Sequence, residues 1–428
     1  MVRRGGVCAA VSPSSVTTRP SLLYVSPVVP DTTGGGLAMR SGLVLEQLAA
    51  HYDVSLLAVP VHGHVAARVP LSIARLSAGG HVTLPPARPS LADLAASARR
   101  IANAETDHAS PAHAPDAFAG IAFSAVHVYR LTALPFAAPY LTTVRRPVRS
   151  IDLDEVESAT RLRLAGTFGP GDRRGRLMRV EAGVFAEVER TVIDAFEHVY
   201  VCSPRELAAL AGSSPCDRVR ILPNALPEIP EPEPPPARGP FTFLFVGTLA
   251  FPANADAVGY LCDEVLPIVR ARAPGPFRMV VVGPSATDHL IGLARSRGVE
   301  VRGAVADVSP SYQEAHTVVA PLRHGGGARL KIIEAMRAGR PIVTTTEGMA
   351  GIALRPGVHV LIGDDPAAFA AQCIRLMADD SLGRRLARAA RDIYIRDHRP
   401  AVMADVIRSS LSGARPTGEP AASTERTG

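Results

Sequence analysis

The chain alternates short apolar runs with segments whose apolar residues recur every three or four positions. In the first half, the run SLLYVSPVV (21–29) is followed by three glycines and then by leucines at helical spacing between Leu37 and Leu48. Short apolar runs indicate strands, and the wider spacing indicates amphipathic helices. In this half we therefore predict strands over 21–29, 54–59, 122–129 and 198–202.

The second half repeats this alternation more clearly. Strands are predicted over 241–247, 278–283, 299–303, 316–322 and 341–346, with helices over 255–271, 288–298 and 329–338. Apolar strands that alternate with amphipathic helices form parallel sheets with helices on both faces. Ligands of such proteins bind at the carboxyl ends of the strands, so we expect these edges to face a cleft between two domains.

One break in composition separates the two halves. The segment LPEIPEPEPPPARGP (226–240) has too much proline for a helix or a central strand, and such runs act as semi-rigid spacers. A last helix could pack back on the N-terminal domain, and small polar residues at both ends of the chain predict disordered tails. The expected divisions are a tail over 1–20, an N-terminal domain over 21–226, a linker over 227–240, a C-terminal domain over 241–395, a helix over 396–412 and a tail over 413–428.

Composition argues against several classes of function. Of the 46 basic residues, 45 are arginine and one is Lys331, and 40 acidic residues leave a formal charge of +6. Aromatic residues make up only 5% of the chain and no basic stripe is interleaved with them, so nucleic-acid binding is not indicated. No run of about 18 apolar residues predicts a transmembrane helix, and the N-terminus lacks the pattern of a secretion signal. The five scattered cysteines predict no disulfide framework or zinc site, and we expect a cytoplasmic protein.

The segment 320–351 carries the strongest chemical signal. A predicted strand ends at Leu322, the glycines 325–327 follow, and a helix begins at about Ala328 or Arg329. Glycines let backbone amides approach a ligand, and the free amides and dipole at a helix N-terminus bind anions. Arg329 and Lys331 add positive charge where it is usually unfavourable, which indicates an external anion.

Glu334 follows Lys331 by three residues, on a neighbouring face of the same helix. Its carboxylate could accept hydrogen bonds from two vicinal hydroxyl groups, as on a ribose. The alternative is a helical ion pair between Lys331 and Glu334, which is worth about 0.3–0.5 kcal/mol.

With the preceding glycines, the segment KIIEAMRAGRPIVTT (331–345) resembles the C-terminal signature of the group 1 glycosyltransferases, family GT4. Three further segments match that family in the expected order: 32–40, ILPNA (221–225) and FVG (245–247). The resemblance extends over about residues 20–395 and is strongest over 241–352. It implies the α/β fold called GT-B, in which two Rossmann-like domains with parallel sheets face a central cleft.

The resemblance implies transfer of a sugar from a nucleotide-diphosphate sugar to an acceptor, with retention of configuration and without a metal or cofactor. The donor would bind to the C-terminal domain and the acceptor mainly to the N-terminal domain. The acceptor could be a small molecule, a glycan or a lipid-linked molecule, and peripheral contact with a membrane stays open. Two alternatives are a non-catalytic homologue, which binds a sugar nucleotide or activates a partner, and a sugar-nucleotide epimerase of the same fold.

On the donor side, Glu334 matches the second glutamate of the family's E-x7-E motif, which implies a ribose contact, whereas the first glutamate falls on Gly326. The loop 247–257 has no basic residue, so Arg329 and Lys331 would carry more of the diphosphate charge. The resemblance implies that the catalytic residues are His127, Arg329 and Lys331. It implies donor contacts from Gly247, Asn254, Gly325, Gly326, Gly327, Arg329, Lys331 and Glu334.

In the first domain, His127 stands near the end of a predicted strand, where a buried structural histidine is the alternative. The segment IDLDEVES (151–158) offers two aspartates that alternate as at a strand end, whereas Glu155 and Glu157 suit the start of a helix. The basic run 169–179 is predicted to be a solvated loop, with contact to an anionic acceptor or membrane as the alternative. The expected acceptor-side residues are Gly35, Gly36, Arg130, Asp152 and Asp154.

Overall fold

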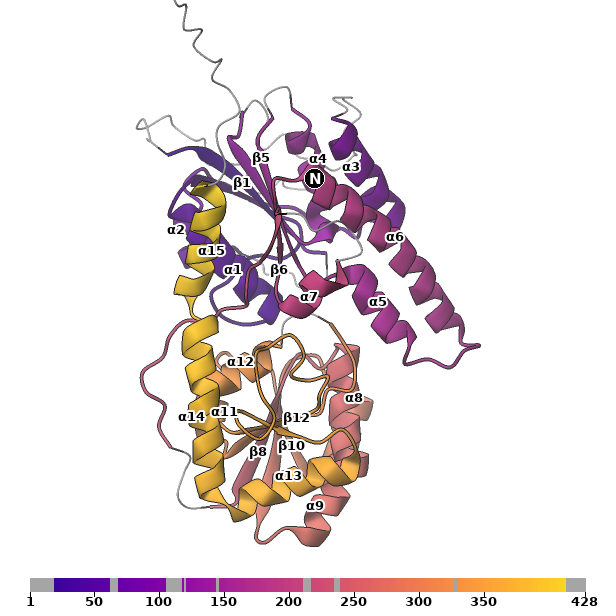
Figure 1. Cartoon of the computed structure of the whole chain (residues 1–428), viewed down its shortest axis with the longest axis vertical. Helices are drawn as coiled ribbons and strands as arrows, with labels where there is room; N and C mark the ends of the chain where they lie inside the picture. The colour runs from indigo at the N-terminus through magenta and orange to yellow at the C-terminus, as the bar shows by residue number, and fades with distance from the viewer. Residues whose placement is uncertain are drawn as a thin grey trace, which may run out of the picture.

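The computed structural model describes residues 19–61, 68–104, 118, 121–143, 146–210, 217–234, 239–326 and 329–412. Two α/β domains lie one above the other along the longest axis (Figure 1). The first has a seven-stranded sheet in the order β3-β2-β1-β4-β5-β6-β7, and the second a six-stranded sheet in the order β10-β9-β8-β11-β12-β13. Every named strand pair is parallel, which confirms the predicted pair of Rossmann-like domains.

The first domain contains more strands than its apolar pattern predicted. Its strands are β1 (Ser21–Ser26), β2 (Asp53–Ala58), β3 (His81–Thr83), β4 (Ala125–Tyr129), β5 (Val148–Asp154), β6 (His198–Val201) and β7 (Val219–Ile221). Its helices are α1 (Gly36–Ala49), α2 (Leu71–Leu76), α3 (Leu91–Asn103), α4 (Leu134–Leu141) after a 3-10 turn, α5 (Glu157–Ala165), α6 (Arg173–Ala195) and α7 (Pro204–Ala209). The basic run 169–179 is not all loop, because α6 begins at Arg173, where the Asp172 side chain caps the helix.

The second domain follows the predicted order of elements. Its strands are β8 (Phe241–Val246), β9 (Phe277–Val282), β10 (Val299–Gly303), β11 (Thr317–Ala320), β12 (Ile342–Thr344) and β13 (Leu361–Ile362). Its helices are α8 (Pro252–Tyr260), a π-helical segment (Leu261–Val265), α9 (Leu266–Arg272), α10 (Asp288–Ser296), α11 (Ser309–Glu314), α12 (Leu330–Arg337), α13 (Pro366–Ala378) and α14 (Asp380–Asp397). The helix predicted over 255–271 is interrupted near Pro267, which lacks the amide hydrogen that a continuous helix needs.

Both sheets are buried on both faces. Along β1, Leu23 and Val25 belong to one hydrophobic core, while Leu22 and Tyr24 belong to the core on the opposite face. Successive side chains of a strand point to opposite faces, so a strand that is apolar throughout requires cover on both. The strand ends at the carboxyl edge are therefore the parts of each sheet that a ligand can reach.

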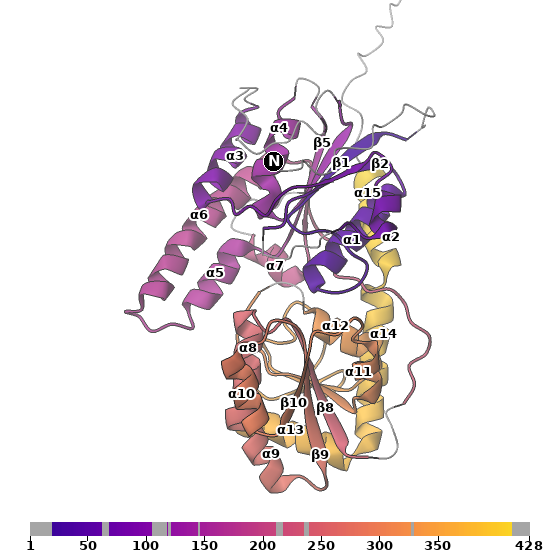
Figure 2. The ribbon, with the colours of Figure 1, turned by 180° about the vertical axis from the view of Figure 1, so that it is seen from behind.

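The chain passes between the domains twice, and the two crossings are tied together. After α14, the helix α15 (Pro400–Ser412) lies against α1 of the first domain, where Met403 and Ile407 join its core (Figures 1 and 2). The Leu226 amide donates to the His398 carbonyl at 3.0 Å, and the Tyr394 hydroxyl donates to the Leu226 carbonyl at 3.1 Å. The start of the proline-rich segment is thus bound to the C-terminal helices.

A buried ion pair joins three parts of the first domain. Arg40 of α1 donates to both oxygens of Asp152 at the end of β5, each at 2.9 Å. The same guanidinium donates to the Leu222 carbonyl at 2.9 Å and to Asn224 Oδ1 at 3.0 Å. The Asp152 side chain is completely buried, so in this conformation it offers no accessible oxygen to an acceptor.

Removing one partner of this pair should destabilise the domain strongly. Asp152→Ala removes the bidentate partner of the buried Arg40 guanidinium and leaves it only Asp154 at 3.4 Å, and we expect the free energy of unfolding to fall by about 3–5 kcal/mol. Urea unfolding followed by circular dichroism measures this change. Asp380→Ala is the matched control, because Asp380 pairs with Arg384 on the surface and its removal should change little. Equal effects of the two substitutions would contradict the structural role of Asp152.

Candidate functional site

The carboxyl edges of the two sheets meet at the junction of the domains, and glycines allow the contact. A β-carbon added at Gly36 would lie 2.5 Å from Leu330 Cδ1, and one at Gly351 would lie 2.8 Å from Ser203 Oγ. Both contacts join one domain to the other, so a side chain at either position would have to displace a side-chain atom of the opposite domain. Gly35 precedes α1 and an added β-carbon there would touch nothing within 4 Å.

The glycine-rich loop after β11 reaches this junction. Gly325 has a φ of +120°, a conformation that favours glycine. Before it, Arg323 Nε donates to Asp256 Oδ2 at 3.0 Å, and the Arg323 guanidinium lies 4.7 Å from the centre of the Tyr260 ring. These contacts fix the start of the loop on α8. Gly327, which the resemblance also assigned to donor binding, lies outside the described residues.

Arg329 is buried immediately before α12. Its Nη2 donates to the Gly325 carbonyl at 3.1 Å and to Glu347 Oε1 at 2.8 Å, whereas its Nε has no hydrogen-bond partner among the described residues. Glu347 also accepts from Arg205 of α7 at 2.8 and 3.0 Å, so this carboxylate bridges the domains. Sequence reasoning missed Glu347, although it stands within the segment 320–351.

Lys331 faces the loop after β8 and has no carboxylate partner among the described residues. Its Nζ donates to Asn254 Oδ1 and lies 4.3 Å from the centre of the Phe245 ring. Asn254 Nδ2 in turn donates to the Thr248 carbonyl at 2.9 Å, which fixes the direction of its oxygen. Burial lowers the pKa of Lys331 to about 7, and the positive charge of Arg329 contributes to the decrease.

Close packing of glycines places Asn254 beside Lys331. Gly283 has a φ of +155° and packs directly on the carbonyl of Gly247. A β-carbon at Gly247 would lie 2.8 Å from Asn254 Nδ2, so a larger residue at 247 would displace the amide.

Glu334 is buried on α12 but forms no ion pair with Lys331. The Tyr312 hydroxyl donates to Glu334 Oε2 at 2.7 Å, and burial raises the pKa of this carboxyl. The alternative interpretation as a helical ion pair therefore fails. Tyr312, in α11, was not predicted, because a tyrosine 22 positions before Glu334 carries no local signal.

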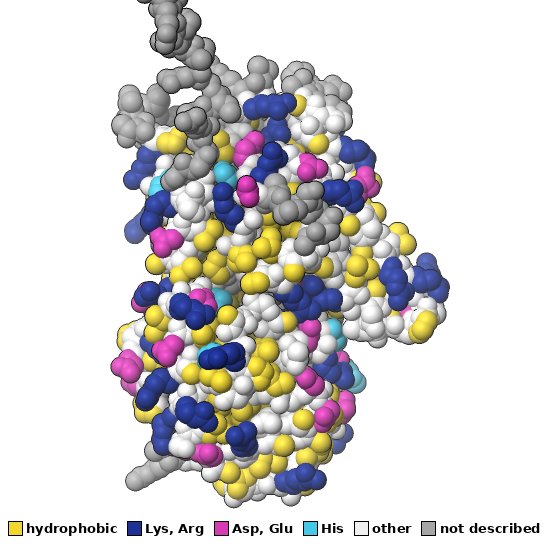
Figure 3. Space-filling model, in the orientation of Figure 1, with side chains coloured by type: hydrophobic (Ala, Val, Ile, Leu, Met, Phe, Trp, Pro, Cys, Tyr) yellow, Lys and Arg dark blue, Asp and Glu magenta, His cyan; other side chains and the backbone are white. Residues whose placement is uncertain are grey.

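Four cationic side chains converge on the glycine-rich loop, from both domains. Burial lowers the pKa of Arg329, and the charges of Arg205 and Arg163 of α5 lower it further, while Glu347 opposes them. Lys331 is the fourth cationic side chain. Figure 3 shows Lys and Arg side chains gathered where the two domains meet. Such mutual repulsion in a partly buried place favours an anion.

The other first-domain candidates lie in ion pairs or in the core. His127 is buried within β4, stacks on Tyr24 with ring centres 5.1 Å apart, and shares a 2.9 Å hydrogen bond with Ser150. Burial lowers the pKa of His127 to about 4, so its imidazole is neutral. In this conformation His127 lies in the core, and its catalytic role stays a prediction.

Arg130 and Asp154 bind each other at the carboxyl ends of β4 and β5. Arg130 Nη1 donates to Asp154 Oδ2 at 3.0 Å, and Arg130 Nη2 donates to Glu155 at 2.6 Å and Glu157 at 2.9 Å. Both Arg130 and Asp154 have positive φ values, 64° and 61°, which are strained for residues with side chains. Neither side chain is free to bind an acceptor in this conformation.

The junction encloses very little space in this conformation. A cavity of about 20 Å³ lies between the domains, lined by residues that include Ser203, Asn224, Arg329 and Gly351, and has room for about one water molecule. A larger ligand must therefore separate the domains or displace side chains.

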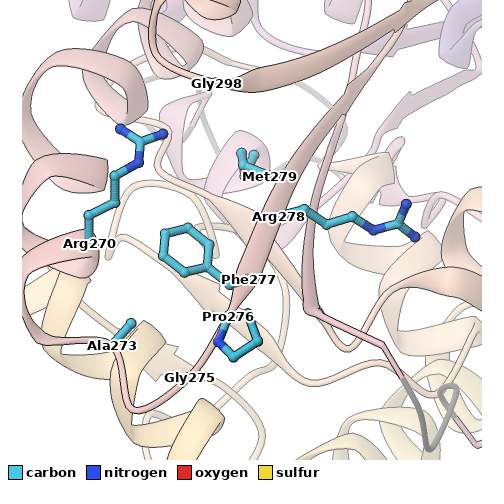
Figure 4. A pocket seen from close by; sticks show the side chains of 8 residues that line it. All are labelled: Arg270, Ala273, Gly275, Pro276, Phe277, Arg278, Met279 and Gly298. Carbon is cyan, nitrogen blue, oxygen red and sulfur yellow. The ribbon is translucent and has the colours of Figure 1, made fainter.

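A larger hollow of about 380 Å³ lies at the opposite edge of the second sheet, at the start of β9 (Figure 4). Arg270 and Arg278 point away from one another there, and Arg278 binds Thr242 and Glu314. Among the described residues that line this hollow, the polar side chains are two arginines that point apart, so the junction remains the candidate site.

The part of the chain that the structure describes offers neither a metal site nor a membrane-spanning helix. No three His, Cys, Asp or Glu side chains lie together in a way that could hold a metal ion. Among the helices that are described, none has the length and apolar character to span a bilayer.

Residues 240–379 match the model of the protein family described as Glycosyl transferases group 1. An uncharacterized 44.6 kDa protein from the cps region of Klebsiella pneumoniae is 26% identical over 139 residues. That match covers 31% of this chain and 36% of the Klebsiella protein. The chain thus matches about a third of the length of this relative.

Solved structures resemble the whole two-domain arrangement. Sucrose-phosphate synthase from Thermosynechococcus elongatus is 15% identical with a TM-score of 0.64, over 92% of this chain and all of that one. The HepE protein of Anabaena, in complex with UDP and glucose, is 13% identical with a TM-score of 0.63 and the same coverage. At these identities the likeness establishes the fold, which is GT-B.

The titration of Lys331 can be observed directly, because this is the only lysine in the chain. Protein labelled with ¹⁵N-lysine should give one side-chain amine signal, with a titration midpoint near pH 7. In denaturant the midpoint should return to about 10.4. Arg329→Met removes a neighbouring positive charge and should raise the midpoint in the folded protein. A midpoint near 10 in the folded wild-type protein would contradict the burial of this amine.

Proposed function

We propose that the protein is a GT4 glycosyltransferase, which moves a sugar, a hexose by preference, from a nucleotide-diphosphate sugar to an acceptor. The observation that carries this proposal is the cluster of Arg329 and Lys331 at the start of α12, beside the amides of the glycine-rich loop. The cluster lies in the domain that matches the glycosyltransferase family. A structural neighbour in complex with UDP and glucose supports a donor of this chemical class.

The diphosphate would bind between Lys331 and Arg329 and replace Glu347 as the partner of Arg329. Its charge would also release the repulsion among the neighbouring cations. Glu334 would accept hydrogen bonds from the ribose hydroxyl groups, with Tyr312 holding one of its oxygens in place. Asn254, already bonded to Lys331, would keep the amine directed at the phosphates.

The same groups would act on the transition state. Negative charge grows on the diphosphate as the bond to the sugar breaks, and fixed cations in a partly dry site stabilise this charge. Because two cations and the helix dipole face the leaving group, we propose that no metal ion is required. We also propose retention of configuration, which the resemblance to the family implies.

The proposal is tested first with a panel of donors. Purified protein is mixed with UDP-, GDP- and dTDP-sugars, and both nucleotide binding and donor breakdown are measured. A glycosyltransferase should bind one base preferentially and release its diphosphate slowly to water. Binding without any turnover would indicate a non-catalytic homologue, and conversion of the sugar without release of diphosphate would indicate an epimerase.

Substitution of Lys331 separates charge from packing. Lys331→Ala should lower kcat/KM for the donor by about ten- to a thousand-fold, because it removes one fixed cation from the leaving diphosphate. Lys331→Arg keeps the charge in a different shape and should retain more activity than alanine. Unchanged turnover of a folded Lys331→Ala protein would rule out this role.

Donor affinity should depend on pH through Lys331. Its pKa in the free protein is about 7, and a bound diphosphate raises it, so binding is accompanied by proton uptake above pH 7. Affinity for the nucleoside diphosphate should therefore fall as pH rises through 7, by at most about tenfold per pH unit. Calorimetry in buffers with different ionisation enthalpies measures the uptake. Lys331→Arg, which stays charged, should flatten the dependence.

A further inference from the structure

A carboxylate of the first domain lies in the space beside Gly326 of the second. A β-carbon added at Gly326 would lie 2.6 Å from Glu155 Oε2 and 2.8 Å from Arg163 Nη2, and would collide with Thr160 Oγ1. The position therefore has no room for a side chain while the domains are together. The glycine-rich loop and Glu155, which are separated by about 170 positions in the sequence, form one surface across the junction.

We propose that, when the domains close on a donor, Glu155 and the backbone at Gly325 and Gly326 form a subsite for hydroxyl groups of its sugar, which take the place of the direct contact between Glu155 and Gly326. This inference rests on the proposed function. It adds a binding group from the first domain to a donor that otherwise binds to the second.

The chemistry of Glu155 suits hydroxyl groups and not phosphate. Although burial opposes it, Arg130 and the Thr160 hydroxyl hold the pKa of Glu155 below its usual range, so the group is ionised. An ionised carboxylate only accepts hydrogen bonds and has about four lone-pair directions. Arg130 takes one at 2.6 Å and Thr160 another at 3.2 Å, which leaves acceptor capacity on the oxygen nearest Gly326.

The charges of the junction are divided along the expected direction of the donor. Arg329 and Lys331 lie on the α12 side of the loop and favour the diphosphate. On the α5 side Arg163 is already paired with Glu206 at 3.1 Å, and Glu155 beside it would repel a phosphate but attract hydroxyl donors. A molecule with an anionic end and a hydroxylated end matches this division, and a sugar nucleotide has both.

A strained turn directs Glu155 across the junction. Its amide donates to the Leu153 carbonyl at 2.8 Å, which closes a three-residue turn around Asp154 with a φ of +61°. This γ-turn geometry is rare and costly for a residue with a side chain. Strained backbone of this kind is concentrated at functional sites, and here it ends β5 abruptly and places Glu155 against Gly326.

The test compares two ligands that differ only by the sugar. Full-length wild-type protein and variants are titrated in a calorimeter with UDP and UDP-glucose, GDP and GDP-mannose, and dTDP and dTDP-glucose. In Glu155→Gln, the affinity for the sugar nucleotide should fall by about ten- to a hundred-fold, because a charged hydrogen bond is lost. The affinity for the matching diphosphate should stay the same or rise.

Glu157→Gln is the matched control. Glu157 binds the same Arg130 nitrogen at 2.9 Å and follows Glu155 by two positions, but none of its atoms is among the nearest to Gly326. This variant should leave the ratio of the two affinities unchanged. Melting curves of both glutamine variants check that each is folded.

A reciprocal exchange gives a second measurement. Gly326→Glu alone places a second carboxylate against Glu155 and should weaken binding of the sugar nucleotide. Combined with Glu155→Gly and with Thr160→Ala, which removes the atom that would collide with the new side chain, the carboxylate is restored from the other domain. This combined variant should regain part of the preference for the sugar nucleotide, relative to Glu155→Gly with Thr160→Ala. No recovery in the folded combined variant would contradict the subsite.

The outcomes separate this inference from the proposed function. If none of the three diphosphates binds to the wild-type protein, the proposed function fails and the subsite fails with it. If a diphosphate binds and Glu155→Gln weakens both ligands equally, or neither, Glu155 acts only in the structure of the junction. That result would overturn the subsite and leave the proposed function standing.

Discussion

The structure depends on positive charge that is partly buried where the two sheets meet. Arg329 has a carboxylate partner there, but Lys331 has only the Asn254 oxygen and the face of Phe245. Removing an ammonium group from water without a counter-charge is costly, and the low pKa of Lys331 expresses this cost. An anion that enters the site removes both the cost and the repulsion between the cations. Without a bound anion, the positive charge at this junction is therefore not fully compensated.

Glu347 connects this charge to the arrangement of the domains. It binds Arg329 of the second domain and Arg205 of the first, so it holds the junction closed while it occupies the place of an anion. On the proposed function, a diphosphate that binds Arg329 would free Glu347 and weaken one link between the domains. The pair with Arg205 is about a quarter exposed and contributes little stability, so this link can break easily. Release of this one carboxylate would let the donor enter before the domains close on its sugar.

Local pattern was sufficient to predict most of the second domain, because its strands are apolar runs and its loop is marked by glycines. The local pattern was not sufficient where polar side chains are buried against partners that lie far away in the sequence. Strand β5 contains Asp152, whose partner Arg40 is 112 positions away, and no periodic pattern reveals this pair. The same reason explains His127, which resembled a site residue but packs on Tyr24 in the core. Contacts between residues far apart in the sequence, and not local secondary-structure propensity, determine which of these polar and charged residues have a structural role.

The glycine at 326 shows how such pairing can alter a motif. From the sequence, Gly326 was a lost carboxylate, because the resemblance places a glutamate there. In the structure, the space of that side chain is occupied by Thr160, Glu155 and Arg163 from the opposite domain. A carboxylate on the loop itself would face the sugar whether the domains were open or closed. In the proposed subsite, Glu155 supplies the carboxylate only when the domains meet, so binding of the sugar would be coupled to closure of the site.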